Sequence, residues 1–414
     1  MLKSIIRKEI LLNLLSYKFS IIIILSSILI FVSIFVMYRD YCLALDNYEI
    51  LRQGDNEEDA IIAVIRPTPL SIFAKGLDEN LCRFYERRGG GRISVGSKQQ
   101  SVNNLFKLFT TPDLMYVVKV ILSLCAMLFA FDMVSGEKEI GTLRQTISNT
   151  VKRPILIISK WTGGFTSFIL PFFIAVLLGT IFLTLSPMVD MNQANSLKLG
   201  LFLLSSVLYL AVFFSLGLLI SCLTHRSSTS LVISLFAWAI FVFLIPNLGN
   251  ILARQFVRIP TVQQLELKRT QSWVITRFKQ HRADRSEHGE MDRRLRVEND
   301  QLTEDYRNRF NNLVRVSQNI TRISPAAAFT CLATDITGTG MSEERRLKRA
   351  VLEYMDMIDD WDDDEGDKPV FGYRRSSIKE ILGPGALSNC LILILFNILF
   401  LTGAHVAFLR YDVR

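Results

Sequence analysis

The stretch SGEKEIGTLRQTISNTVKRPILIISK, residues Ser135 to Lys160, is a charged segment that lies between two strongly apolar runs. It is too short and too polar to cross a membrane. Pro154 ends any helix that precedes it, because proline has no amide hydrogen and clashes with the preceding turn. Gly136 and Gly141 punctuate its beginning. The pattern predicts a short amphipathic helix of about three turns that lies at the membrane surface.

The composition of the chain is that of an integral membrane protein. Half of its 414 residues are hydrophobic and the mean hydropathy is +0.30, which gives more apolar surface than a soluble fold of this size needs. The net charge of +8 is what basic residues beside membrane spans produce, so it does not indicate nucleic acid. The six cysteines include no Cys-x-x-Cys pair, so a zinc ribbon or a thioredoxin-like site has no support.

Six apolar runs are long enough to cross a bilayer at about 1.5 Å per residue. They cover Phe19–Met37, Leu114–Val134, Ile155–Leu185, Leu197–Leu223, Thr229–Ile251 and Leu387–Leu409. The third run is long enough to tilt or bend, and we expect it to do so at Gly163, Gly164 and Pro171. The sequence therefore predicts an all-α integral membrane protein with six transmembrane helices.

The short connections predict the orientation of these spans. Basic residues cluster between the second and third spans, between the fourth and fifth, and after the last, and such residues favour the cytoplasmic side. Both termini are then cytoplasmic, and the long segments 38–113 and 253–385 are extracytoplasmic. Ionisable groups inside the spans usually mark an ion path, and such groups are nearly missing here. Lys119 and Asp132 lie near the outer and inner ends of the second span. Such spans suit a lipid-like substrate, or a bundle that transmits motion without passing anything.

Residues 135–160 resemble a known family. An acidic pair with the sequence Glu-x-Gly-Thr-Leu, a polar turn and a basic-Pro step into an apolar helix are similar to the cytoplasmic coupling loop of type-2 ABC exporter permeases. In that family the loop sits in a cleft of a separate ATPase subunit and passes its motion to the membrane helices. The resemblance places the loop at residues 135–154 and implies that the ATPase is contacted by Glu137, Glu139, Gly141, Thr142, Leu143 and Arg144. An ordinary juxtamembrane loop whose charges face water is the alternative.

The N-terminal residues 1–18 have apolar and basic positions at helical spacing, which predicts an interfacial helix that lies flat before the first span. It is not a cleaved signal, because the apolar run that follows is long enough to cross and no small-residue cleavage site is present. The resembled family begins with such an elbow helix near the ATPase, and Arg7, Lys8 and Glu9 match its RKE sequence. An ordinary membrane-anchoring helix is the alternative.

The second long segment divides by composition. Residues 261–322 contain no proline and one glycine, Gly289, together with charge pairs at i,i+4 spacing such as Glu290 with Arg294. This pattern predicts two long helices that meet near Gly289 as a hairpin, with apolar positions including Trp273 and Phe278 facing the second arm in a loose coiled coil. The sequence ISPAAAF at 323–329 and the Thr-Gly-Thr-Gly turn after it also resemble a subfamily with a large extracytoplasmic insertion.

Three further patterns in the long segments have competing interpretations. The run RRGGGR at 87–92 fits a flexible hairpin tip better than a phosphate loop, because it lacks the spacing of a nucleotide loop. The acidic run Asp359–Asp367 begins like a calcium loop, but it lacks the glycine at position six and the glutamate at position twelve, so a solvated acidic loop is favoured. Cys42 and Cys82 lie in one extracytoplasmic segment, and the sequence leaves their pairing open.

The sequence offers no catalytic constellation. It contains no GxxxxGK[ST] loop and no HExxH, and its four histidines are scattered. We therefore expect no enzymatic activity and no metal or cofactor bound by this chain, with ATP and Mg²⁺ held by a partner ATPase.

These observations and the resemblance together predict a permease subunit of an ATP-driven type-2 ABC exporter. Its expected partners are an ABC ATPase subunit, a second permease copy or homologue in a dimer, the lipid membrane and an extracytoplasmic partner protein, with no nucleic acid. Its expected location is the bacterial cytoplasmic (inner) membrane. The alternative is a membrane scaffold that transports nothing and whose extracytoplasmic helices bind envelope proteins.

Overall fold

The computed structural model describes residues 2–53, 60–78, 84–88, 93–96, 112–148, 153–282, 287–359 and 370–410. The chain divides into two compact units, which are described separately below. The first unit comprises residues 1–242 and 328–414, and the second comprises residues 243–327. Residues 360–367 of the acidic run, residues 89–92 of the glycine run and Cys82 lie outside the described residues, so the calcium and disulfide hypotheses stay untested.

Six helices in the described ranges are long and apolar enough to cross a membrane, as the sequence predicts. They run over Tyr17–Arg52, Leu114–Ile140, Arg153–Thr184, Gln193–Leu223, Ser227–Phe256 and Pro384–Leu409. Their regular parts are α2 (Tyr17–Gln53), α5 (Leu114–Tyr116) with α6 (Ser123–Ala130), α9 (Arg153–Thr184), α10 (Gln193–Leu223), α11 (Ser227–Ala239) with α12 (Ile245–Phe256), and α18 (Pro384–Leu409). Short π-helical stretches, η2 (Val117–Leu122) and η3 (Ile240–Leu244), interrupt the second and fifth of these.

The first of these helices continues well beyond the apolar run 19–37 that hydropathy marks. Buried residues recur along α2 at Ile30, Ile34, Met37, Tyr41 and Leu45. This spacing keeps one stripe of the helix packed on its neighbours although the residues around it become polar. Hydropathy alone therefore predicts an end of this helix at Met37, about four turns before it ends at Gln53. The helical spacing of the buried residues continues beyond Met37.

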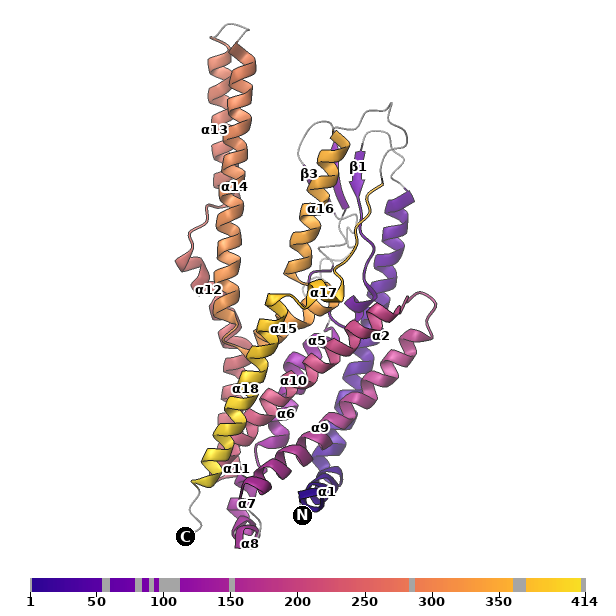
Figure 1. The fold of residues 1–414 in the computed structure, drawn as a ribbon, viewed down its shortest axis with the longest axis vertical. Helices are drawn as coiled ribbons and strands as arrows, with labels where there is room; N and C mark the ends of the chain where they lie inside the picture. Colours follow the sequence, from indigo (N-terminus) through magenta and orange to yellow (C-terminus); the bar gives the residue numbers. More distant parts are fainter. Residues whose placement is uncertain are drawn as a thin grey trace. The chain divides into compact units, whose positions relative to one another are not determined.

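In the first unit, α10 is the central helix and packs against both α18 and α6, while α9 packs against α1 (Leu2–Leu14) and α2 (Figure 1). Apolar lipid chains give little hydrophobic drive for helix association, so close packing has to hold the bundle. Glycines supply this close packing. A Cβ at Gly217 of α10 would lie 2.9 Å from the Met127 carbonyl of α6, and a Cβ at Gly179 of α9 would clash with the Ile34 side chain of α2. Aromatic contacts add to this packing, as where Tyr209 stacks on Phe329 at 4.4 Å.

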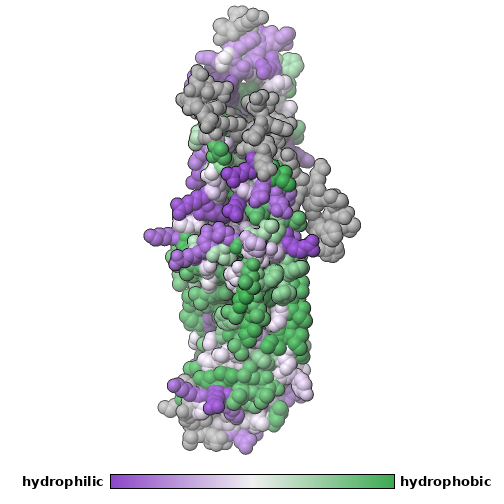
Figure 2. All heavy atoms as spheres, turned by 90° about the vertical axis from the view of Figure 1, so that its right-hand side faces the viewer, coloured by the Kyte–Doolittle hydropathy of each residue, from purple (hydrophilic) through white to green (hydrophobic). Residues whose placement is uncertain are grey.

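A belt of hydrophobic residues lies between two hydrophilic zones on the face shown in Figure 2. On α2 and α9, side chains that point away from the bundle are apolar and exposed. They include Ile21, Ile24, Ile28 and Phe35 of α2, and Phe173, Leu177 and Ile181 of α9. Exposed residues of this kind are expected where a surface faces lipid instead of water.

The first long segment contains a small sheet that the all-α prediction lacks. Its strands β1 (Ala60–Ala63), β2 (Phe84–Arg88) and β3 (Ile93–Gly96) form an antiparallel sheet in the order β1-β2-β3. Arg87 lies opposite Ile93, so the glycine run joins two paired strands, which agrees with the hairpin interpretation. Strands of four or five residues show too few apolar and polar alternations to be recognised from sequence.

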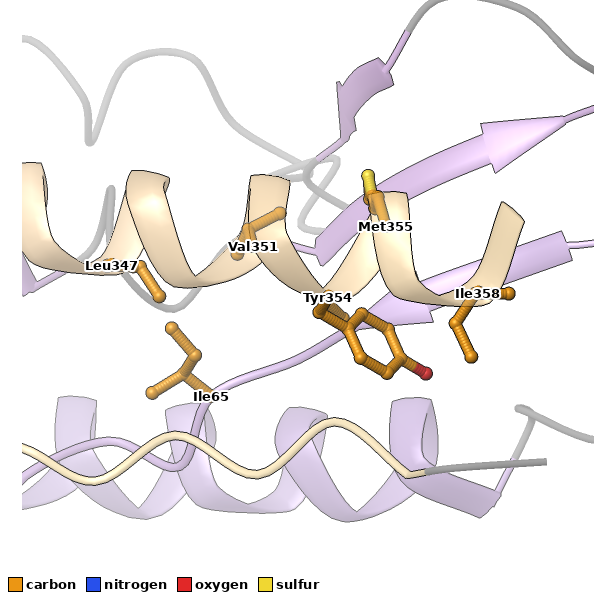
Figure 3. Packing of buried hydrophobic residues seen from close by; sticks show 7 residues of the cluster. Ile65, Leu347, Val351, Tyr354, Met355 and Ile358 are labelled. Carbon is orange, nitrogen blue, oxygen red and sulfur yellow. The ribbon is translucent and has the colours of Figure 1, made fainter. Parts of the chain in front are cut away.

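One face of α16 (Met341–Asp359) packs over this sheet (Figure 3). Leu347, Val351, Tyr354, Met355 and Ile358 lie at helical spacing on that face and form a buried cluster with Ala63 and Ile65. We call residues 60–78, 84–88, 93–96, 337–359 and 370–381 the sheet layer. It lies at the opposite end of the first unit from the N-terminus (Figure 1).

The sheet layer is closed by contacts between residues far apart in sequence. The Leu77 amide donates to the Thr339 carbonyl at 2.8 Å, and the Thr339 hydroxyl donates to the Ala74 carbonyl at 3.0 Å. Arg375 donates to Asp78 at 3.0 Å and to the Gly338 carbonyl at 2.9 Å. The predicted single domain 253–385 is therefore divided, because its residues from 328 onward fold with the first long segment.

A second polar cluster ties the sheet layer to α10. The buried carboxylate of Glu343 accepts hydrogen bonds from the Tyr373 hydroxyl at 2.9 Å and from the Ser376 amide at 3.2 Å. Lys198 of α10 donates to the Ser376 carbonyl at 2.9 Å. Burial, together with the nearby Glu343, raises the pKa of Tyr373 above its ordinary value, so this hydroxyl stays protonated as a donor.

The second unit contains the predicted helical hairpin, formed by α13 (Val262–Gln280) and α14 (His288–Thr321), which run side by side (Figure 1). Thr261 begins α13 with a capping box: its hydroxyl accepts from the Gln264 amide at 3.2 Å. The arms are joined by polar contacts, such as Ser272 to Glu298 at 3.0 Å and Gln280 to Asp292 at 2.8 Å.

The predicted apolar seam of the hairpin is wrong for three of its members. Trp273 is 50% exposed, Phe278 is 70% exposed and Phe310 of α14 is 44% exposed. Leu265 of α13 is buried, and polar pairs along the two arms add to the remaining apolar contacts. Of the predicted charge pairs, Glu290 with Arg294 is present at 3.5 Å.

The closure of the sheet layer predicts the effect of Gly76→Ala. Gly76 has φ +48°, and a Cβ there would lie 2.6 Å from the Thr339 carbonyl. Backbone strain of this kind costs on the order of 1 to 3 kcal/mol, so we expect a clearly lower melting temperature of the purified protein in detergent. Gly372→Ala, at a site with open space, is the matched control, and equal stability of the two variants would contradict the assignment.

Candidate coupling site

The charged segment forms two short helices instead of the predicted single helix. These are α7 (Ser135–Ile140) and α8 (Thr142–Ser148), and Gly141 between them has φ +84°. Glycine adopts this left-handed conformation at little cost and commonly ends a helix there. The chain therefore turns at Gly141, and α8 takes a different direction from α7.

The connection between α6 and α7, residues 131–134, is not helical. Its freed backbone groups are taken up by serines of neighbouring helices. The Ser221 hydroxyl of α10 accepts from the Val134 amide at 3.0 Å and from the Ser135 amide at 2.9 Å. The Ser230 hydroxyl of α11 donates to the Phe131 carbonyl at 2.6 Å. A break in an apolar bundle needs such partners, because no water replaces the lost helical bonds.

Glu137 of α7, whose side chain is half-buried, belongs to an ion cluster around a buried lysine that joins it to two other helices. Lys160 of α9, whose side chain is 3% exposed, reaches Glu137 Oε1 at 2.8 Å and Glu9 Oε1 of α1 at 3.4 Å. A buried cation of this kind is stable only when paired. The cluster therefore connects the predicted coupling segment, the predicted elbow helix and the third span.

The next two charges of α7 hold the end of α10 and the start of α11. The Lys138 ammonium donates to the carbonyls of Cys222 and Thr224, the latter at 2.9 Å. Glu139 Oε2 accepts from the Ser227 amide at 2.9 Å. A cation at a helix C-terminus and an anion at an N-terminus both match the helix dipole.

The remaining predicted residues divide between the interior and the surface. Leu143 is fully buried, whereas Thr142 and Arg144 are exposed and neighbouring Ile140 is 78% exposed. The structure thus brings Glu137, Glu139 and Leu143 into contacts within the chain. The exposed part of the segment includes Ile140, Thr142 and Arg144, which we call the outward face, and Glu139 beside them is exposed as well.

The predicted elbow residues divide in the same way. Arg7 and Lys8 of α1 are exposed, and Glu9 pairs with Lys160. The helix α1 approaches α9 closely, since a Cβ at Gly163 would lie 2.7 Å from the Glu9 Cβ. A Cβ at Gly164 would lie 2.6 Å from the Met133 Cε. The two glycines predicted as bend points therefore serve close packing, and α9 is helical throughout.

Sequence reasoning missed Lys160, Ser221 and Ser227 as members of this site. Lys160 ends the quoted stretch and looks like an ordinary interfacial lysine, although it follows five apolar or small residues within a span. The two serines have no spacing that relates them to residues about 90 positions earlier. Only the packing of α10 and α11 against α7 identifies them.

No group of three His, Cys, Asp or Glu residues in the described ranges is arranged to hold a metal ion. Neutral polar contacts join the spans instead. Trp161 of α9 donates to the Ser215 hydroxyl of α10 at 2.9 Å, and Asn397 of α18 donates to the Leu208 carbonyl at 3.1 Å. At the coupling end Asp132 pairs with Lys18. These contacts fasten helices together and offer no ion path.

The fold and this site define a membrane protein in which one short charged segment is bound to α9, α10 and α11 at one end of a bundle of membrane-crossing helices. The family model described as ABC-2 family transporter protein matches residues 5–413, and the chain belongs to this family. No curated protein matches the chain. Membership implies a membrane context and an ABC ATPase partner, as the resemblance of residues 135–160 predicts.

The Ser221 contact predicts the effect of Ser221→Ala. This change leaves two buried amides without an acceptor, which costs about 1 to 3 kcal/mol for each. We expect a lower melting temperature and faster hydrogen exchange in residues 131–140. Ser205→Ala, which removes only a bond to Phe202 within α10, is the control; if both variants behave alike, Ser221 does not support the break.

Proposed function

We propose that the chain is the permease subunit of an ATP-driven type-2 ABC exporter and that the outward face of α7 and α8 docks the separate ATPase. The observation that supports this most is that the charges of α7 bind other helices of the bundle, while residues next to them remain exposed. The segment's three charged residues before Gly141 all pair with groups of other helices, and Glu139, Ile140, Thr142 and Arg144 are exposed. An ordinary solvated loop would not pair all three charges with groups of α9, α10 and α11.

This proposal refines the site that the resemblance implies. Glu137 and Glu139 serve to fix α7 on the bundle, and direct ATPase contact passes to the outward face. An exposed apolar residue beside a basic one is a surface that a protein partner can bury. ATP and Mg²⁺ belong to that partner, and the permease itself catalyses no reaction.

The orientation that goes with this proposal puts the α7 end in the cytoplasm. Arg153 at the start of α9 donates to the Leu409 carbonyl at the end of α18 at 2.9 Å, and α1 meets α7 through Lys160. Both ends of the described chain therefore belong to the same end of the first unit as α7. This agrees with two cytoplasmic termini, an extracytoplasmic sheet layer and a bacterial inner-membrane location, where two permease copies form the transporter.

Single cysteines test this orientation. In a background without native cysteines, Arg349→Cys in the exposed part of α16 should react with an impermeant thiol reagent added to intact cells. Gln145→Cys in α8 should react only after the membrane is permeabilised. The opposite pattern would invert the orientation and remove α8 from the reach of a cytoplasmic ATPase.

Charge reversal at Arg144 tests the docking surface. We expect Arg144→Glu to lower the affinity for the ABC ATPase about tenfold, which corresponds to roughly 1.4 kcal/mol, because it reverses a charge in the contact. Capture of the ATPase by the purified permease measures this. Arg349→Glu at the other end of the first unit is the control and should not change capture.

The scaffold alternative and the transporter proposal predict different results when the protein is purified. A scaffold whose spans only anchor it would purify without a stoichiometric ATPase. Unchanged affinity for Arg144→Glu with an ATPase present would instead retain the transporter and move the docking surface elsewhere.

A further inference from the structure

We propose that Lys160 is a positioning residue that joins the coupling segment and the N-terminal helix to the third span through one shared cation. A displacement of α7 would then move α1 and α9 together. What drives that displacement rests on the proposed function, whereas the sharing of the cation does not.

The contacts of Lys160 carry the first step. Its ammonium has three N–H donors, and it reaches one carboxylate on each of two helices, Glu137 on α7 and Glu9 on α1. Lys160 itself lies on α9, about two helical turns after this helix begins at Arg153. Three helices therefore meet at one buried group, and neither of the two ion pairs is local in sequence.

The connection along the chain carries the second step. The segment 131–134 between α6 and α7 is not helical, so an axial push on α7 does not pass along a continuous helix into the second span. The ion cluster offers a direct lateral route into α9. Close packing supports it, because Gly163 lies one turn after Lys160 and has room only for hydrogen where Glu9 approaches.

The charge balance of the cluster carries the third step. Two carboxylates share one ammonium, and Glu137 Oε2 is buried with no hydrogen-bond partner among the described residues. Either acid alone can pair the lysine, so removing one leaves a balanced pair. Removing both leaves a buried cation without a counter-charge, which is far more costly. A shared cation is therefore distinguished from two independent contacts by a non-additive response.

The experiment uses Glu9→Gln, Glu137→Gln and the double variant in the full-length protein in detergent. We expect each single variant to keep a melting temperature close to the original, and the double variant to lose much more than the sum of the two losses. Additive losses would overturn the proposal, and so would a Glu137→Gln loss equal to that of the double variant.

Amide hydrogen exchange then distinguishes a specific connection of α1 and α7 through Lys160 from a general loss of stability. Lys160→Met should speed amide exchange in both α1 and α7 by about tenfold or more. Gly163→Ala keeps all three charges but displaces α1, so it should speed exchange in α1 alone. Lys198→Met, which removes another buried lysine from the sheet-layer end of α10, is the matched control and should leave α1 and α7 unchanged. Acceleration confined to α9 in Lys160→Met would contradict the joint.

A final comparison tests transmission and keeps it apart from the docking proposal. At a saturating concentration of the ABC ATPase, exchange in α1 should change in the original protein but not in Glu9→Leu, whose side chain has no acceptor for Lys160. If α1 responds equally in the original protein and in Glu9→Leu, Glu9 does not transmit the motion. If the ATPase does not bind the original protein, the proposed function fails, while the melting and exchange experiments still decide whether the cation is shared.

Discussion

Backbone hydrogen bonding in an apolar belt is the constraint on which the first unit depends. Where helices break, a side chain from a neighbour has to supply the missing partner. Ser221 and Ser230 do so at the start of α7. Tyr209 of α10 does so in the second span, where its hydroxyl donates to the Lys119 carbonyl of the π-helical stretch η2 at 2.8 Å. The irregular parts of the bundle are therefore also the parts where helices are fastened to one another.

This constraint explains the central position of α10. Its side chains supply partners to α6, α7 and η2, and its own carboxyl end is held by Lys138. A helix that supplies hydrogen-bond partners to several neighbours is buried on most sides. In the most apolar part of α10, 72% of the residues are buried. By contrast, only 11% of the residues in the most apolar part of the fifth span are buried. This span therefore presents apolar surface to lipid.

The sequence predicts the spans well because length and hydropathy decide them. It delimits the charged segment through Gly136, Gly141 and Pro154, although it expects one helix where the structure has α7 and α8. It does not predict what the charges touch. Lys160 and Ser227 meet the segment only after the helices pack, and no local period relates them to Glu137 or Glu139. The small sheet is not predicted for a different reason, since its strands are too short to show an alternation of apolar and polar residues. The hairpin helices are predictable, while the exposure of Trp273 and Phe278 depends on contacts that composition does not report.

The closure of the sheet layer has a consequence for how the chain matures. Arg375 and Asp78 are separated by 297 residues, and at 5–20 residues per second the ribosome takes roughly 15 to 60 s to make that length. During this interval residues 60–78 lack their later contacts with Thr339 and Arg375. Four of the six membrane-crossing helices lie wholly between the two partners, so the first five are made before the sheet layer can close. A chain truncated between Phe256 and Arg375 would therefore retain these five spans and still leave this layer open to proteases.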